Sequence, residues 1–240
     1  MRLIDNFLKK FRKTAAQNSH TCDGCGVEVF SYPTPRICPE CQETLVYNNE
    51  YQCDKCGRPT PMQGVCNTCK SWLPNFEKGA SAFAYYDKAA SIVNGFKNGK
   101  RWLRYWFAEE LEKVLSRLPE KEYTLVAVPL TKEKRRKRGY NQSEELVEEL
   151  AGLTGFSFRV DLLERKQTGE QKHQSGGARR KNIQGAFRVT DRKFCKGKDL
   201  LVVDDILTSG ATLSEISSVL LRAGANSVYV LTVAAVPDQI

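Results

Sequence analysis

The amino-acid sequence predicts an α/β fold, a doubly wound parallel sheet preceded by a small cysteine-rich module. Helical and strand-like patterns alternate over residues 80–236, which is typical of a parallel sheet with helices on both faces. Residues 200–203 are four consecutive aliphatic residues, as in a strand that is buried on both faces. Between residues 22 and 69 the chain is instead dense in cysteine, proline and glycine and has no long apolar run. That stretch cannot build a core of its own.

Three parts are therefore expected: a basic amphipathic helix within residues 1–20, the cysteine-rich module at 21–72 and the α/β domain at 80–240. In residues 1–13 one helical face carries Leu3, Ile4, Phe7, Leu8 and Phe11. Such a helix could pack on its own protein or on a partner, or make peripheral contact with the inner face of the membrane. Since the chain has neither a run of about 20 apolar residues nor a signal-peptide core, we expect a cytoplasmic protein.

Eight of the cysteines form four CxxC pairs, and the pairs repeat, because a glycine, Gly26 or Gly57, follows the first pair of each half. Four thiolates at this spacing suit a tetrahedral Zn²⁺, whereas disulfides are rare in the cytoplasm. We predict a double zinc ribbon with two structural zinc sites; a redox role is the less favoured alternative, and interleaved pairing across the two ions is open. The predicted ligands are Cys22, Cys25, Cys38, Cys41, Cys53, Cys56, Cys66 and Cys69.

The α/β domain begins with a predicted strand at residues 80–86. Ile92, Val93 and Phe96 begin a helical pattern, and a longer amphipathic helix runs from Trp102 to Leu115. A buried-type strand follows at residues 124–129, then a helix opened by Asn141 and Ser143, and the final strand is expected at residues 227–236.

Residues 208–212 connect the strand at 200–203 to a helix with Leu213, Ile216, Val219 and Leu220 on its apolar face. Such a tight loop directs backbone N–H groups and the positive end of the helix dipole at one spot, which suits a phosphate monoester. Asp204 and Asp205 can accept hydrogen bonds from sugar hydroxyls or hold the water shell of a metal. The combination indicates a ribose 5-phosphate, since a plain helix cap accounts for only one of the loop's hydroxyls.

The net charge of +9 is unevenly distributed. Residues 131–140 hold six basic residues and one acidic residue, and residues 162–198 hold eleven and three. The rest of the chain is therefore net acidic. A localised basic surface is expected, suited to polyphosphate or to nucleic acid, and composition does not choose between them.

At residues 202–212, VVDDILTSGAT, the sequence resembles the phosphoribosyl pyrophosphate signature of the type I phosphoribosyltransferases. The resemblance extends over nearly the whole chain to the ComF family of competence-associated proteins, in which cysteine knuckles precede a phosphoribosyltransferase-like domain. It is carried by the CxxC pairs, VPL at 128–130, RGYNQS at 138–143, RKNIQGAF at 180–187 and the aspartate pair with its TSGAT loop. It implies a sheet of type I phosphoribosyltransferase type and a role in cytoplasmic steps of DNA uptake for natural transformation.

The resemblance also implies roles for individual residues. Phosphoribosyl pyrophosphate would bind with Mg²⁺, its 5-phosphate at Thr208, Ser209, Gly210, Ala211 and Thr212. Its pyrophosphate would lie against Pro129, Leu130, Thr131 and Lys132. Asp204 and Asp205, as the expected catalytic pair, would hold the ribose hydroxyls and favour positive charge at C1. Arg165 begins a basic, glycine-rich segment, residues 165–179, which would close over the site or, alternatively, remain a solvated loop.

Three functions are consistent with these residues. The protein could bind phosphoribosyl pyrophosphate and single-stranded DNA beside proteins of the DNA-uptake machinery, act as a nucleobase-salvage phosphoribosyltransferase, or serve as a non-catalytic DNA-binding adaptor. Any cover over the sugar site should come from residues before about 80, so we expect the ribbons near the Asp204 loop. Aromatic residues that could stack on bases, or fill the module's small core, are Phe30, Tyr32, Tyr47, Tyr51 and Trp72.

Overall fold

The structure is a computed structural model that describes residues 21–29, 36–48, 51–166 and 183–238. The helix expected within residues 1–20 lies outside the described residues, as does most of the basic segment at 165–179. Among the helices of the described residues, none combines the length and the apolar character that a membrane span requires.

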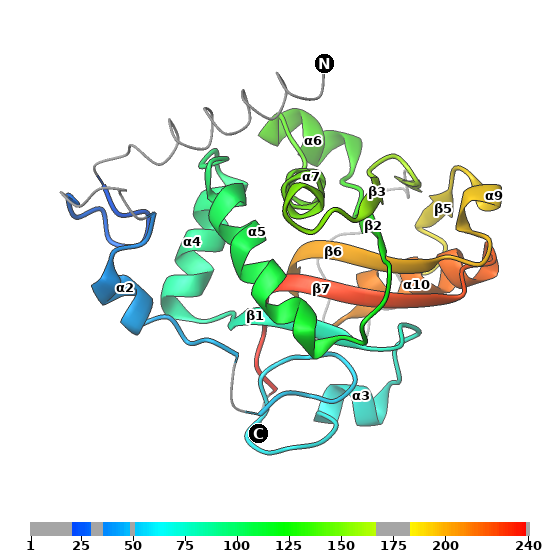
Figure 1. Ribbon diagram of the computed structural model, residues 1–240, viewed down its shortest axis with the longest axis horizontal. Coiled ribbons are helices and arrows are strands. Elements are labelled where there is room, and N and C mark those ends of the chain that lie inside the picture. The colour runs from blue at the N-terminus through cyan, green and yellow to red at the C-terminus, as the bar shows by residue number, and fades with distance from the viewer. Residues whose placement is uncertain (1–20, 30–35, 49–50, 167–182, 239–240) are drawn as a thin grey trace.

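A five-stranded parallel sheet forms the centre of the molecule (Figure 1). Its order is β1 (Gly79–Ala84), β7 (Ser227–Ala235), β6 (Asp199–Leu207), β2 (Thr124–Ala127) and β3 (Ser157–Arg159). In register, Leu200 of β6 lies between Val228 of β7 and Thr124 of β2. Every residue of β1, β2 and β7 is buried, as expected for strands covered on both faces.

Helices cover both faces of this sheet. On one face α4 (Asp87–Lys97), α5 (Leu103–Val114) and α7 (Gln142–Thr154) share a hydrophobic cluster with Leu201 and Val203. On the other face α10 (Ala211–Arg222) shares a second cluster with Leu200 and Val202. The four aliphatic residues of β6 therefore alternate between two cores, which explains why none of them is polar and confirms the doubly wound sheet.

Short elements fill the connections. They are α2 (Pro39–Glu43), α3 (Asn67–Ser71), the 3₁₀ helix Leu115–Arg117, α6 (Lys132–Arg138), α9 (Arg192–Cys195) and an antiparallel pair of β4 (Leu163–Arg165) with β5 (Phe187–Val189). Helix α6 forms in the basic stretch directly after the VPL motif. Thr131 caps its first turn and Gly139, with a φ of 77°, ends it in the left-handed conformation.

The two cysteine clusters lie on opposite sides of the sheet's edge strand. Three of the first four cysteines belong to the hydrophobic cluster of α4 and α5, and all of the second four belong to that of α10. The segment between them covers the free edge of β1, because Asn48 donates from its backbone N–H to Ala82 and the carbonyl of Val46 accepts from Ala84. The division into parts at 21–72 and 80–240 stays a prediction, and the cysteine module shares its cores with the sheet.

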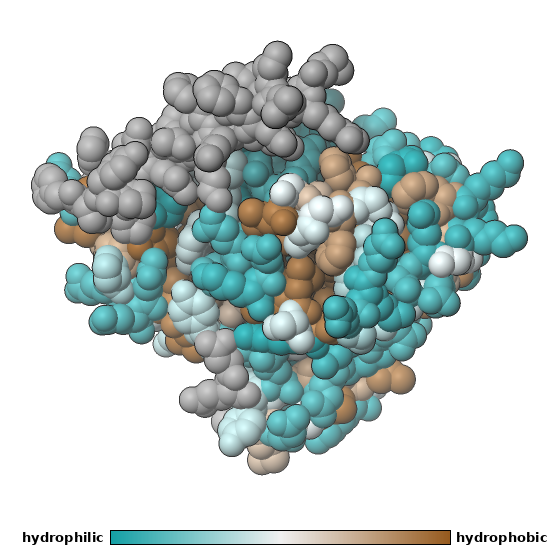
Figure 2. Space-filling model, viewed as in Figure 1, coloured by the Kyte–Doolittle hydropathy of each residue, from teal (hydrophilic) through white to brown (hydrophobic). Residues whose placement is uncertain are grey.

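Hydrophilic residues cover most of the lower and right-hand parts of the face in Figure 2, and the visible hydrophobic residues gather toward its middle. Exposed large hydrophobic side chains such as Tyr51, Met62 and Leu73 are few and scattered along the described chain. Single exposed apolar residues of this kind are normal for a globular protein.

Candidate functional site

The phosphate loop, residues 208–212, leaves β6 and leads directly into α10 at the carboxyl edge of the sheet (Figure 1). Gly210 is the residue before the helix and has a φ of 77°, a conformation that favours glycine. The hydroxyl of Ser209 accepts a hydrogen bond from the backbone N–H of Ala211. Gly210 and Ala211 are buried, Ser209 and Thr212 are half-buried and Thr208 is exposed. The predicted loop thus exists as a strand, tight turn and helix of twelve residues.

The carboxylates of Asp204 and Asp205 lie at the end of β6, directly before this loop. Oδ1 of Asp204 accepts hydrogen bonds from the hydroxyl of Ser143 at 2.8 Å and from the backbone N–H of Asp205 at 2.9 Å. Burial and the neighbouring Asp205 nevertheless raise the pKa of Asp204 to about 7. A carboxyl that ionises near neutral pH in a crowded polar cluster is typical of functional sites.

Three cationic side chains from three elements lie near this acidic pair, and a fourth, Arg138, lies near Lys134. Lys97, at the end of α4, forms an ion pair with Asp205 with 3.2 Å between Nζ and Oδ1. Burial and the nearby charges of Arg165, Arg138 and Lys97 lower the pKa of Lys134 on α6, against an opposing effect of Asp205. The pKa of Arg165 is also lowered by burial, while the charge of Asp204 raises it. Such a cluster of positive charge beside two carboxylates can neutralise a ligand that carries several phosphate charges.

The motifs that are separated in sequence are joined here by side-chain hydrogen bonds. Nδ2 of Asn141 donates to the carbonyl of Val128, which links the RGYNQS motif to the VPL motif. Ser143, two residues on, links the same motif to Asp204. Both side chains are almost completely buried, at 2% exposure each. The geometry of the site therefore depends on the start of α7 as well as on β6.

The RKNIQGAF motif supports Arg165. In the β4–β5 pair Arg165 lies opposite Phe187, and its guanidinium carbon lies 5.4 Å from the centre of the Phe187 ring. Gly185 donates its backbone N–H to Oε1 of Glu215 on α10 at 2.8 Å, which ties this arm to the helix after the phosphate loop. The end of β4 thus presents Arg165 close enough to Asp204 for the two charges to interact.

The structure gives a place to every predicted site residue. Pro129, Leu130 and Thr131 are half-buried between β2 and α6, and Lys132 is exposed as the first residue of α6. Sequence reasoning missed Lys97, Lys134 and Ser143 as site residues. Ser143 stands within a motif that was singled out, and Lys134 lies in a basic run that was noted, but Lys97 carries no local signal. What the residues contribute to binding remains a prediction.

The cysteines form two tetrads in sequential order, Cys22, Cys25, Cys38 and Cys41, then Cys53, Cys56, Cys66 and Cys69. Within each tetrad all four sulfur atoms lie within 4.8 Å of one another. The sulfur atoms are 3.9 Å apart for Cys25 and Cys38 and 3.8 Å apart for Cys56 and Cys66. Four Zn–S bonds of about 2.3 Å in a tetrahedron require sulfur atoms about 3.8 Å apart, so both tetrads fit Zn²⁺.

Backbone amides also prepare the sulfur atoms for a metal. Sγ of Cys22 accepts from the N–H groups of Gly24 and Cys38, and Sγ of Cys53 accepts from those of Cys56 and Cys66. Burial raises the pKa of Cys22, but these bonds outweigh it and bring the pKa down to about 7. The thiolate of Cys22, the form that binds metal, is therefore more populated near neutral pH than that of an ordinary cysteine.

The second ribbon, residues 51–72, touches the phosphate loop, whereas the first ribbon contacts the connection between α4 and α5. In the first ribbon Asp23 accepts from the indole N–H of Trp102 and pairs with Lys100. In the second ribbon Nη2 of Arg58 donates to the carbonyl of Thr208 at 2.6 Å. The expectation that the ribbons lie near the Asp204 loop agrees with the structure for the second ribbon only, because the first ribbon packs with α4 and α5 on the other face of the sheet.

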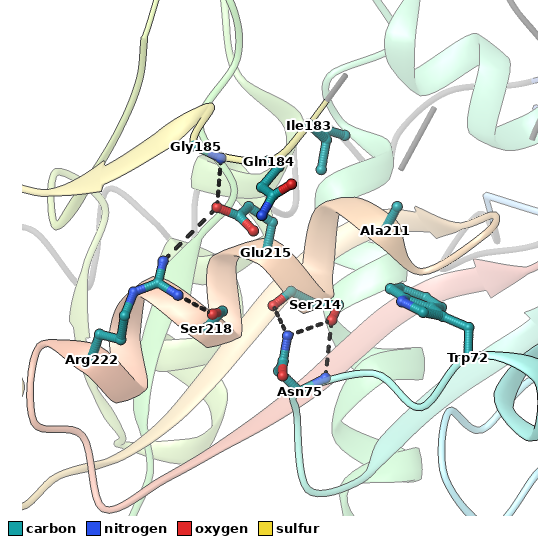
Figure 3. Close-up of a pocket in the computed structure, with 10 residues that line it drawn as sticks. All are labelled: Trp72, Asn75, Ile183, Gln184, Gly185, Ala211, Ser214, Glu215, Ser218 and Arg222. Carbon is teal, nitrogen blue, oxygen red and sulfur yellow. Dashed lines mark hydrogen bonds and ion pairs between the residues drawn. The ribbon is translucent and has the colours of Figure 1, made fainter. Parts of the chain in front are cut away.

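A pocket of about 610 Å³ lies along the outer face of α10 and adjoins the phosphate loop at Ala211 (Figure 3). Figure 3 shows Trp72 and Asn75 on one side of the helix and the segment 183–185 on another, with Asn75 bonded to Ser214. Among the predicted stacking aromatics, Tyr47 instead packs on Phe83, with ring centres 4.9 Å apart, and Tyr51 is 49% exposed. Phe30 and Tyr32 lie outside the described residues. The pocket has the volume of a small-ligand site.

Known proteins resemble this chain over most of its length. A family model described as phosphoribosyl transferase domain matches residues 111–240. The chain is 26% identical over 200 residues to competence protein ComFC of Bacillus subtilis (strain 168), which covers 80% of each chain. It is 30% identical over 203 residues to competence protein ComFC of Streptococcus pneumoniae (strain ATCC BAA-255 / R6), covering 80% of this chain and 84% of the relative.

Among solved structures, one described as the allosteric regulatory enzyme of purine biosynthesis matches 54% of this chain. The match covers 25% of that enzyme, with 20% identity and a TM-score of 0.38.

Proposed function

The chain belongs to the phosphoribosyl transferase domain family and, within it, to the ComFC competence proteins, and from this premise we propose that it binds phosphoribosyl pyrophosphate and single-stranded DNA during cytoplasmic steps of DNA uptake. That it is a competence-related, phosphoribosyltransferase-like protein follows from the family itself. The ligands, the reaction and the partners among the DNA-uptake proteins are the proposal.

One observation supports this ligand: the cations of Lys97, Lys134 and Arg165 lie near the two carboxylates that precede the phosphate loop, with Arg138 beside Lys134. Phosphoribosyl pyrophosphate has phosphate groups at both ends of a sugar. In the proposed arrangement the backbone and hydroxyls of residues 208–212 hold the 5-phosphate, and Asp204 and Asp205 accept the ribose hydroxyls. The pyrophosphate lies toward residues 129–132 and the cations.

Bound with the pyrophosphate, Mg²⁺ would neutralise part of its charge. If transfer occurs, departure of pyrophosphate leaves positive charge at C1 of the ribose. The two carboxylates then favour that charge electrostatically, and Asp204 needs to be ionised to do so. Ser143 and the backbone N–H of Asp205 support the ionised form, because both donate to Oδ1 of Asp204.

Calorimetric titration with phosphoribosyl pyrophosphate and Mg²⁺ tests this site. We expect binding by the native protein and none by the Asp204→Asn, Asp205→Asn double variant, because both sugar-hydroxyl acceptors lose their charge. Glu77→Gln, an exposed carboxylate before β1, is the matched control and should bind as the native protein does. No binding by the native protein would reject the ligand and leave a non-catalytic DNA-binding adaptor as the better description.

The DNA part of the proposal rests on the basic helix α6, in which Arg136 and Lys137 are exposed. Charge–phosphate contacts are sequence-independent and weaken as salt displaces them. Binding of a labelled oligonucleotide should therefore fall steeply with salt, and an Arg136→Gln, Lys137→Gln variant should lower the log–log slope by about 1 to 2. A control variant, Lys70→Gln on α3, should keep the native slope, and an unchanged slope in the α6 variant would move the DNA surface elsewhere.

A further inference from the structure

A buried arginine of the second ribbon donates a hydrogen bond to the backbone of the phosphate loop. Arg58 is 4% exposed, and its guanidinium contacts both parts of the structure at once. Nη2 donates to the carbonyl of Thr208 at 2.6 Å, and Nε donates to Sγ of Cys56 at 3.4 Å. Because a guanidinium is planar and rigid, the position of the second tetrad sets the direction of the bond to the loop.

The bond to Thr208 has a direct consequence for the next residue. In a trans peptide the carbonyl and the following N–H point in opposite directions in one plane. Holding the carbonyl of Thr208 toward Arg58 therefore turns the N–H of Ser209 away from the ribbon. Backbone N–H groups of this kind are what a phosphate-binding loop offers its ligand.

Trp72 supplies a second contact between the ribbon and the loop. A ring carbon of Trp72 lies 3.6 Å from the point that a Cβ atom would occupy on Gly210. The ring thus packs against the turn residue whose φ of 77° sets the start of α10. Arg58 and Trp72 together place the ribbon against two of the three residues that connect β6 to α10.

The ribbon itself is anchored to the sheet independently of the loop. Beyond β7, Asp238 donates its backbone N–H to the carbonyl of Pro59 at 3.0 Å, and its Oδ2 accepts from the N–H of Asn67 at 2.8 Å. At the other end Gly79, the first residue of β1, donates to the carbonyl of Lys55 at 2.8 Å. A loop that rests on this ribbon is therefore fixed relative to the whole sheet.

We propose that Arg58 is a positioning residue for the phosphate loop, so that the second cysteine tetrad, and not the first, keeps the loop ready for its ligand. The identity of that ligand rests on the function proposed above, whereas the support of the loop does not. The first ribbon provides the natural comparison. Its buried arginine, Arg36, lies near Asp23 and the ring of Trp102, on the opposite face of the sheet.

Amide hydrogen exchange of residues 207–212 in the ligand-free, zinc-loaded protein tests the support directly. Arg58→Gln removes the two-ended contact, and we expect the exchange of these amides to rise about tenfold or more, as for the loss of a charged hydrogen bond. Arg36→Gln should leave them unchanged. Unchanged exchange in Arg58→Gln would overturn the proposal, whatever the protein binds.

Two further measurements separate this proposal from the proposed ligand and from general unfolding. The zinc content of each variant reports whether the second tetrad is intact, and calorimetry reports the affinity for phosphoribosyl pyrophosphate. If Arg58→Gln loses zinc, the exchange of the loop amides is measured in Arg58→Lys instead. That variant keeps a cation beside Cys56 but lacks the rigid, planar guanidinium. Faster loop exchange in the zinc-loaded lysine variant supports the proposal, and native exchange overturns it. If the native protein does not bind phosphoribosyl pyrophosphate, that result rejects the proposed ligand and leaves the positioning role of Arg58 standing.

Discussion

The hydroxyl of Ser143, at the start of α7, donates a hydrogen bond to Oδ1 of Asp204, at the end of β6, over 2.8 Å. This bond joins two motifs that lie 61 positions apart in the sequence. It opposes the burial and the like charge of Asp205, which together raise the pKa of Asp204. The protonation state of the acidic pair is thus adjusted by a helix that contributes no charge of its own at this point.

Ser143→Ala should raise the pKa of Asp204 further, since the variant loses a hydrogen bond to the ionised form. A bond to a charged group contributes about 1.5–3 kcal/mol, which corresponds to a rise of about one pKa unit or more. Carbon-detected NMR titration of the aspartate carboxyls measures it. Ser217→Ala, which removes an equally buried hydroxyl bonded to the backbone of α10, should leave the titration unchanged. Coincident titrations of the Ser143 variant and the native protein would disprove this role.

Asp204→Asn should stabilise the ligand-free protein above neutral pH. The folded pKa of about 7 lies above the usual unfolded value of about 3.9, so the folded state keeps a proton that the unfolded state releases. The free energy of unfolding therefore falls as pH rises between about 4 and 7. Because asparagine does not ionise, the variant does not lose this free energy of unfolding as the pH rises. It should be more stable than the native protein at pH 8 by on the order of 2 kcal/mol. Urea denaturation at pH 5 and pH 8 measures the difference, and an equal pH response in both proteins would refute it.

Lys97→Met should destabilise the protein and weaken the binding of phosphoribosyl pyrophosphate. The ion pair of Lys97 with Asp205 is mostly buried, with side chains 19% and 12% exposed, so Asp205 would be left without its cation. A loss of about 2 kcal/mol in the free energy of unfolding is expected.

The matched control for that variant is Lys100→Met, three residues further along the chain and beyond the end of α4. The Lys100 side chain is 40% exposed in its pair with Asp23, so its removal should change stability by less than about 1 kcal/mol. Chemical denaturation compares the two variants at one pH. Equal losses in the free energy of unfolding would show that the buried Lys97 pair stabilises the protein no more than the exposed Lys100 pair.

The two cysteine tetrads, once loaded with zinc, should release the metal at different rates. Cys25 is exposed in the first tetrad, whereas every cysteine of the second tetrad is buried. A thiol-reactive mercurial should therefore liberate zinc in two phases, followed with a colorimetric zinc indicator. Cys25→Ser should lose the fast phase and keep the slow one. A fast phase that survives in Cys25→Ser would assign the accessible site to the second tetrad.

The fold was largely predictable because its signals are local. Aliphatic runs marked β2, β6 and β7, and the order of hydroxyls and glycine after Asp205 marked the phosphate loop. The strand expected at 80–86 is shorter in the structure, because Tyr86 already serves as the cap of α4 and Asp87 has a positive φ of 39°. The sequential pairing of the cysteines, which spacing had left open, also follows from the structure.

The rest of the site depends on contacts that no local pattern encodes. Lys97 is the last residue of a helix whose sequence pattern contains no functional motif. Only the packing of α4 brings its side chain to Asp205. Arg58 reaches Thr208 across 150 positions of sequence. Its own neighbourhood indicates only a zinc knuckle. Contacts of this range arise from the sheet order, which periodicity alone does not fix.

The sheet order also determines when the molecule can be completed during its synthesis. Within the described residues, β1 has β7 as its only partner strand, and these two strands are more than 140 positions apart in the chain. At the ribosome, Phe83 and its neighbours in β1 emerge long before residues 227–235 are made. The cysteine segment beside them emerges first and supplies backbone bonds to the other edge of β1 through residues 46–48. The cysteine-rich part of the nascent chain can thus shield this hydrophobic strand from aggregation until its partner strand is made.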